Sequence, residues 1–290
     1  MTGSASRELE LKLDGGCPAL GPQRIAATLT VPGDNSNGTM LVCLPGGGYS
    51  RFYYQAEFDG FEGYSFAEYM TAKGYTVLTL DHLGMGDSAR PDSVELVDKT
   101  CIAAFNHAAV QSILSEFETR PQLVGIGHSM GGMALIEQQA THATFDKICV
   151  LGWTNIGLSI DTSELDLKPE LHQYAPTDRA QMRPLFFLPD VPDELIKQDE
   201  AYSSLTPSPF AQQAVQPGIV AAEAAAITCP VFLSYGDVDI SPAPANEPGF
   251  YQSAKSVDPM ILTGSAHNHN YATTRAKLWD NIAAFATAND

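Results

Sequence analysis

One serine stands in a setting that suits nucleophilic chemistry. The pentapeptide Gly127-His128-Ser129-Met130-Gly131 follows the apolar run 122–126 and precedes the helix-like stretch 133–140. A serine hydroxyl is a poor nucleophile, so it must be exposed on a sharp turn where a base reaches one side and a substrate the other. Glycines two positions before and after the serine let a strand and a helix pass closely enough for such a turn. The sequence therefore predicts that Ser129 is presented on a strand-to-helix turn.

Acidic and imidazole side chains that could activate this serine come later in the chain. Asp237 and Asp239 directly follow one strand-like run, and His267 and His269 follow the next. Because the carboxyl ends of parallel strands meet at one edge of a sheet, these side chains are expected on the edge that carries Ser129. The residues alone leave two candidates for the acid and two for the base.

The elements that must position these groups form a regular series. Short β-type runs alternate with helical ones, which predicts an α/β fold with a mostly parallel sheet covered on both faces. The first two runs alternate in the manner of an antiparallel opening pair. The eight expected strands are 8–13, 24–31, 40–44, 75–80, 123–127, 148–153, 230–235 and 259–262. The expected flanking helices are 65–72, 101–117, 133–141 and 272–287.

One segment interrupts that alternation. Residues 158–227 show no convincing buried strand, contain many prolines, and include amphipathic pieces such as 193–198. A segment of ~70 residues is too long for a simple loop in a compact domain, so we interpret it as an inserted helical cap. The predicted organisation is a core of residues 1–157 and 228–290, with a cap over the carboxyl ends of the strands.

The order serine, aspartate, histidine, each after a sheet strand, resembles the α/β-hydrolase superfamily. The resemblance covers about residues 8–157 and 228–288, and it implies the α/β-hydrolase fold with a nucleophile elbow at Ser129. In similar proteins the acid stands three residues after the glycine that ends its strand, which favours Asp239, and a Gly-x-x-His pattern favours His267. Asp237 is then expected at the surface or capping a turn. His269 is expected at the pocket rim or in solvent, and His128 as a packing residue.

Two further motifs are similar to that family. The run Leu44-Pro45-Gly46-Gly47-Gly48-Tyr49 stands where members carry His-Gly or His-Gly-Gly-Gly, with Pro45 in the place of the histidine. The resemblance implies an oxyanion hole, for which Gly47, Gly48 and Met130 are the candidate backbone donors. The turn 81–88 resembles the family's Asp-x-x-Gly-x-Gly-x-Ser motif, for which we expect an architectural role.

Composition excludes several classes of function. With 34 acidic and 16 basic residues the chain carries a net charge of -18, which opposes binding to nucleic acid or to an anionic membrane. No apolar run approaches the ~18 residues of a membrane span, and the first ten residues contain no apolar signal-like region. Five cysteines without metal-like spacing indicate reduced thiols in a cytoplasmic protein. No metal and no cofactor are expected, the expected partner is a small-molecule substrate, and the sequence leaves the oligomeric state open.

The chemistry implied by these residues is acyl transfer through a covalent intermediate. We expect His267 to take the proton of Ser129 while Asp239 orients the imidazole, so that activity falls as pH drops through about 6 to 7. The favoured reaction is hydrolysis of a carboxylic ester or lactone of a small to medium, largely apolar substrate, with Tyr49 and Trp153 as substrate-binding residues. Hydrolysis of a carbon-carbon bond, hydroxynitrile lysis, and a non-catalytic small-molecule receptor on the same fold remain alternatives.

Overall fold

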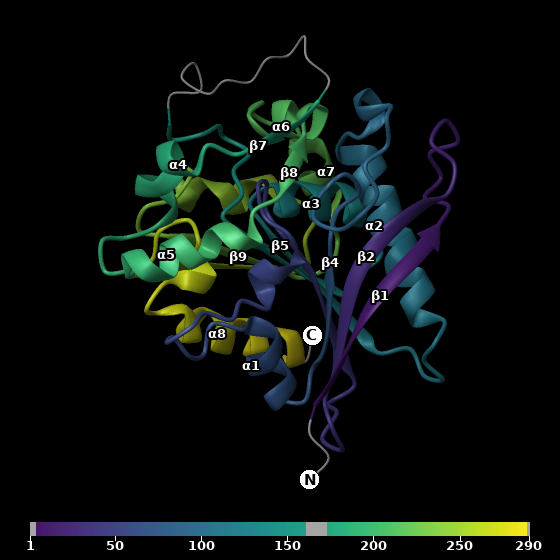
Figure 1. Ribbon diagram of the computed structural model, residues 1–290, viewed down its shortest axis with the longest axis horizontal. Coiled ribbons are helices and arrows are strands. Elements are labelled where there is room, and N and C mark those ends of the chain that lie inside the picture. Colours follow the sequence, from purple (N-terminus) through teal and green to yellow (C-terminus); the bar gives the residue numbers. More distant parts are fainter. Residues whose placement is uncertain (1–3, 161–172, 289–290) are drawn as a thin grey trace.

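An eight-stranded sheet forms the centre of the molecule. The computed structural model describes residues 4–160 and 173–288. The strands lie in the order β1-β2-β4-β3-β5-β6-β9-β10 (Figure 1). Their bounds are β1 Ala5–Leu13, β2 Gln23–Val31, β3 Thr39–Leu44, β4 Thr76–Leu80, β5 Gln122–His128, β6 Lys147–Leu151, β9 Val231–Gly236 and β10 Val257–Leu262. The predicted eight-stranded, mostly parallel sheet is confirmed.

The strand register brings the predicted site segments to one edge. Strands β1 and β2 pair antiparallel, β2 pairs antiparallel with β4, and every other neighbour in this sheet is parallel. Leu44 at the end of β3 pairs with Gly127, and Gly236 at the end of β9 pairs with Leu262. The loops that follow β3, β5, β9 and β10 therefore leave the sheet side by side.

Four helices cover the two faces of the sheet, α1 Phe66–Ala72 and α8 Arg275–Thr287 on one side, α2 Lys99–Leu114 and α3 Met130–His142 on the other (Figure 1). The alternation of β3 shows how both faces are packed: Met40 and Val42 join the core beneath α2 and α3, whereas Leu41 and Cys43 join the core beneath α1 and α8. Such an element is buried on both sides, which explains its continuous apolar sequence.

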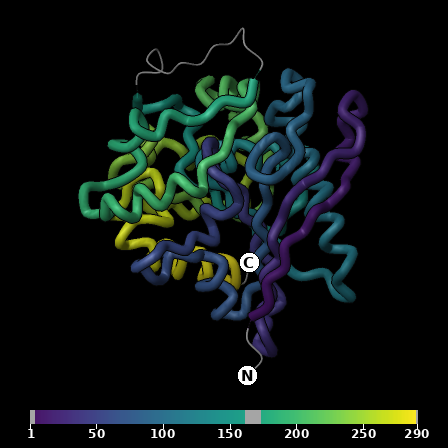
Figure 2. The backbone as a smooth tube through the Cα atoms, viewed as in Figure 1, coloured from purple at the N-terminus to yellow at the C-terminus, as the bar shows by residue number. Residues whose placement is uncertain are grey.

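The predicted cap segment is helical with one small sheet. Its described part contains α4 Arg179–Phe186, α5 Asp193–Asp199, α6 Ser208–Ala214 and α7 Ala221–Ala226. The sequence predicted no convincing buried strand here, and the two strands present are short: β7 Tyr174–Pro176, none of whose residues is buried, pairs antiparallel with β8 Leu205–Pro207. Three residues are too few to show an alternating pattern. In Figure 2 this teal and green chain lies on the side of the molecule away from the purple β1–β2 pair. Residues 161–172 of the predicted cap lie outside the described residues.

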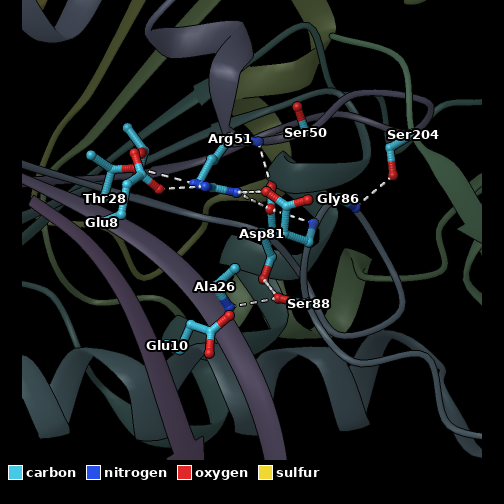
Figure 3. A network of polar contacts seen from close by, with 12 residues as sticks. Glu8, Glu10, Ala26, Thr28, Ser50, Arg51, Asp81, Gly86, Ser88 and Ser204 are labelled. Carbon is cyan, nitrogen blue, oxygen red and sulfur yellow. Dashed lines mark hydrogen bonds and ion pairs between the residues drawn. The ribbon is translucent and has the colours of Figure 1, made fainter.

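The turn after β4 is held by a buried ion pair. The Asp81 carboxylate accepts hydrogen bonds from the guanidinium of Arg51 at 2.5 Å and from the backbone N–H groups of Arg51 and Asp87. Figure 3 shows Arg51 lying between Asp81 on one side and Glu8 and Thr28 on the other. Burial opposes the charge of Arg51, but its carboxylate partners outweigh burial and raise its pKa above the usual value. These contacts give the motif an architectural role, as expected.

Two sequence expectations concern the setting of the protein. All five cysteines lie within the described residues and none of them forms a disulfide, and Cys43, Cys101 and Cys149 are buried. No helix in the described part of the chain combines the length and the apolar character that crossing a membrane requires.

Candidate active site

Ser129 lies on a sharp turn between β5 and α3. Its backbone has φ 55° and ψ -123°, and such a positive φ is uncommon for a residue with a side chain. The Ser129 N–H donates to the carbonyl oxygen of Leu151 at 2.8 Å, which fixes the turn against β6. A Cβ at Gly127 would lie 2.4 Å from the carbonyl oxygen of Gly131, and a Cβ at Gly131 would lie 2.3 Å from that of Leu44. Both glycines are therefore required by close backbone contacts.

His267 and Asp239 form a buried pair at the same edge. His267 Nδ1 lies 2.6 Å from Asp239 Oδ1, and both side chains are almost fully buried. Asp237, the alternative acid, is exposed and accepts the N–H of Gly264 at 2.6 Å, in the turn-capping place expected for it. Of the two candidate acids, the structure brings Asp239 to the imidazole.

The Asp239 carboxylate is held in its ionised form. Burial alone would raise its pKa, but His267 and His269 outweigh burial and hold the pKa of Asp239 well below its usual value. An ionised carboxylate accepts the Nδ1–H of His267, which leaves Nε2 of that ring as the atom able to take a proton.

His269 does not lie where the sequence placed it. The expectation of a pocket-rim or solvent position was wrong, because the side chain is fully buried and its Nε2 lies 2.9 Å from Asp239 Oδ2. The Gly-x-x-His pattern identifies only the first histidine of the loop, and the spacing of two residues gave no sign that both rings turn toward one carboxylate.

His128 is a packing residue, as expected. Its Nε2 lies 2.7 Å from the carbonyl oxygen of His267, and its ring stacks on Tyr53 with centroids 4.9 Å apart. Burial, followed by the nearby His267 and His269, lowers the pKa of His128 well below its usual value. The neutral ring of His128 donates a hydrogen bond to the backbone of His267, and so stabilises the loop that carries the proposed base.

A cavity of about 560 Å³ opens over the serine. Ser129, His267, Gly47, Met130 and Trp153 all lie on its wall. The cap contributes most of the remaining surface, through the side chains Gln173, Ala175, Pro176, Thr177, Asp178, Gln181, Met182, Phe186, Thr206, Ser208, Ala211, Gln212, Ala214 and Val215. Two glutamines, Gln181 and Gln212, are engaged with other groups and also face this space. The structure thus brings the predicted nucleophile and base to one cavity, beneath the predicted cap.

The glycine loop after β3 contributes one of its two predicted oxyanion donors to this wall. Gly47 lines the cavity beside Met130, and a Cβ at Gly47 would meet the Met130 sulfur at 2.1 Å. Gly48 points elsewhere: its N–H donates to Thr206 Oγ1 at 2.9 Å. A cap threonine therefore already holds the amide that the sequence assigned to an oxyanion.

Tyr49, predicted to bind substrate, lies in a buried polar network instead. Its hydroxyl donates to Asp199 Oδ2 at 2.8 Å and accepts from Asn268 Nδ2 at 2.7 Å. Arg179 pairs with Asp199, covers the Tyr49 ring at 4.2 Å, and donates to the carbonyl oxygen of Gly48. The network joins the cap to the glycine loop and to the residue after His267. No sequence motif marks it, because its members are distant in the chain.

Metal ligation has no support in the described residues. Within 4–160 and 173–288, no group of three or more histidine, cysteine, aspartate or glutamate side chains could hold a metal ion. The charged and imidazole groups of the site pair with one another instead.

The fold and site define an α/β protein in which a serine, an imidazole and a carboxylate meet at the carboxyl edge of the sheet. The chain belongs to the alpha/beta hydrolase family, whose model matches residues 41–277. A search of curated proteins found none that matches the chain.

Solved structures share this fold at low sequence identity. The chain is similar to a highly thermostable carboxyl esterase from Bacillus coagulans at 20% identity and TM-score 0.69, with 97% of each chain covered. It is similar to the enol-lactonase from Burkholderia xenovorans LB400 at 15% identity and TM-score 0.68, covering 97% of this chain and 100% of that one. It is also similar to proline iminopeptidase from Mycobacterium smegmatis at 15% identity and TM-score 0.64, covering 96% and 97%. At these identities the likeness concerns the fold.

Proposed function

We propose that the protein is a serine hydrolase that cleaves a carboxylic ester or lactone through an acyl-enzyme intermediate. The observation that carries the proposal is the convergence on one cavity of Ser129, on its sharp turn, and His267, whose imidazole is paired with Asp239 behind the cavity wall. A nucleophile, a base and the group that orients the base are the three parts that acyl transfer by serine requires.

The reaction would begin with attack of Ser129 Oγ on the carbonyl carbon. His267 Nε2 takes the hydroxyl proton, and the Asp239 carboxylate stabilises the imidazolium. The His267 imidazole is hydrogen-bonded to Asp239, and a bond from the base to the nucleophile often tightens only in the substrate complex. His267 then protonates the leaving alcohol, and water releases the acid by the reverse proton route.

The developing oxyanion would be held by backbone amides. Met130 begins α3 directly after Ser129, and Gly47 lies beside it on the cavity wall. We assign the N–H groups of Met130 and Gly47 to this role, since Gly48 is engaged by Thr206. Removing one such donor typically costs ~10² to 10³ in rate.

The cavity suits a small to medium, largely apolar substrate. Its volume of about 560 Å³ lies in the range of ligand pockets, and Trp153, Phe186 and Met182 give it apolar surface. None of the described residues that line it is lysine or arginine, so nothing on this wall offers a permanent cation to an acidic substrate. The esterase and lactonase among the similar structures support the ester or lactone. The five cysteines, none of which forms a disulfide, support a cytoplasmic setting.

The test is hydrolysis of aryl esters of increasing acyl length, run beside a lactone and an amide. The amide is included because a peptidase is also among the similar structures. Ser129→Ala is expected to lose multiple-turnover hydrolysis by about 10⁶-fold, and Ser112→Ala, half-buried in α2 and not part of the cavity wall, to retain it. Undiminished hydrolysis by Ser129→Ala would exclude Ser129 as nucleophile. Tight binding of a small molecule without turnover would favour the alternative of a non-catalytic receptor on the same fold.

A further inference from the structure

The proposed mechanism leaves one buried group of the site without a task. His269 is fully buried, lies two residues after the base, and directs Nε2 to the carboxylate oxygen that His267 does not contact. Its ring centroid is 6.3 Å from that of His267 and 5.4 Å from that of His128. It is therefore part of the site and out of reach of the cavity that holds the nucleophile.

Four N–H donors surround the Asp239 carboxylate, two on each oxygen. Oδ1 lies 2.6 Å from His267 Nδ1 and accepts the N–H of Ile240 at 2.7 Å. Oδ2 lies 2.9 Å from His269 Nε2 and accepts the N–H of Gly236 at 2.8 Å. The backbone donors hold the carboxylate whatever the side chains are. His269 is thus the one donor on Oδ2 that a substitution can remove.

The surroundings of His269 determine its protonation. Its Nδ1 is buried and has no hydrogen-bond partner among the described residues. A second N–H on this ring would be buried without an acceptor, so the ring is neutral and carries its hydrogen on Nε2. The other titratable groups of the described residues that face the cluster are His128, from the end of β5, and Tyr53 and Tyr235, whose pKa values burial raises. None of the three supplies a charge near neutral pH.

We propose that His269 is a positioning residue that acts on the base through Asp239. A neutral N–H donor on Oδ2 draws charge away from Oδ1, and this weakens the hold of the carboxylate on a protonated His267. His267 then stays neutral, and the enzyme stays active, to a lower pH than if His267 were the only imidazole bonded to the Asp239 carboxylate. This role rests on the proposed function, because it needs His267 as the base.

The test compares two substitutions of His269. His269→Phe keeps the ring and removes the donor, whereas His269→Gln places an amide N–H near the position of Nε2. For His269→Phe we expect the acid limb of the kcat/KM profile to move to higher pH by about half a unit to one unit, with kcat reduced about tenfold. His269→Gln is expected to restore the wild-type limb. His142→Gln, at the end of α3, is the matched control and leaves the profile unchanged.

A second measurement keeps the inference separate from the proposed reaction. The imidazole of His267 is titrated by nitrogen-15 NMR in the wild-type protein and in both variants, which needs no substrate. If the titration midpoint of His267 rises in His269→Phe but not in His269→Gln, the result supports the proposal even where no hydrolysis is found. An unchanged or lowered midpoint in folded His269→Phe overturns it, and if that variant does not fold, a changed midpoint in His269→Gln overturns it.

Discussion

Two carboxylates are buried at the carboxyl edge of the same sheet, and they differ in the basic side chains that face them. Asp81, after β4, is paired with the guanidinium of Arg51, which is charged at every pH that the protein meets. Asp239, after β9, is paired with two imidazoles, and that of His267 takes up and gives back a proton in the proposed reaction. A permanent pair fixes architecture, whereas a titratable pair can move a proton. The partner, more than burial, distinguishes the structural carboxylate from the one proposed to be catalytic.

The largest expected effect is the loss of activity on changing the titratable pair. Asp239→Asn is expected to lower kcat by about 10⁴, because the amide orients the His267 ring wrongly and does not stabilise its charged form. Steady-state hydrolysis measures this, with exposed Asp237→Asn as the control that keeps its activity. A comparable loss in Asp237→Asn would move the acid to that residue.

Breaking the permanent Arg51–Asp81 ion pair is expected to lower stability rather than activity. Arg51→Met leaves the Asp81 carboxylate buried without its cation and should lower the free energy of unfolding by about 3–5 kcal/mol. Urea unfolding measures this, and the activity per folded molecule is expected to stay near that of the wild type. Arg24→Met removes an exposed pair with Glu10 and should cost about 1 kcal/mol or less. Equal losses in the two variants would contradict the contrast drawn between them.

A buried histidine provides an intermediate effect that depends on pH. Burial lowers the pKa of His82 from 6.5 to about 4, while its Nε2 lies 3.0 Å from the carbonyl oxygen of Pro45. Below pH 6.5 the unfolded chain takes up this proton first, so stability falls as pH drops and levels off below about 4. The loss from His82 amounts to about 3 kcal/mol. Between pH 6.5 and about 4, the free energy of unfolding should fall less with pH in His82→Gln than in the wild type. An equally steep fall in that variant would assign the effect to another group.

The smallest effect is expected where a neutral acceptor is removed. Thr206→Val leaves the Gly48 N–H buried without its partner, which should lower the free energy of unfolding by about 1–3 kcal/mol. Thr206→Ser keeps the hydroxyl and is expected to behave like the wild type in the same thermal or urea unfolding. A valine variant as stable as the serine variant would show that water or another group replaces this acceptor.

The sequence predicted the sheet and helices well because each carries a local signal. The apolar runs, the glycines around Ser129 and the strand-ending positions of Asp239 and His267 are all readable within a few residues. What it did not predict depends on contacts between distant segments. The engagement of Gly48 by Thr206 and the burial of Tyr49 against Arg179 and Asp199 arise only when the predicted cap segment meets the core. The pairing of His269 with Asp239 arises within the core, where the loops after β9 and β10 meet. Short strands such as β7 and β8 likewise depend on their partner rather than on a pattern of their own.

The Arg179–Asp199 pair has a consequence for anyone who would exchange the cap of this protein for another. Through Tyr49 and Asn268 the pair contacts the loops that carry Gly47 and His267, so it belongs to the frame of the site although it lies in the cap segment. A grafted cap that alters only cavity-lining positions such as Met182 or Val215 keeps that frame. A graft that omits Arg179 or Asp199 leaves a buried charge unmatched beside both loops, and we expect it to displace the proposed catalytic groups as well as to change the cavity.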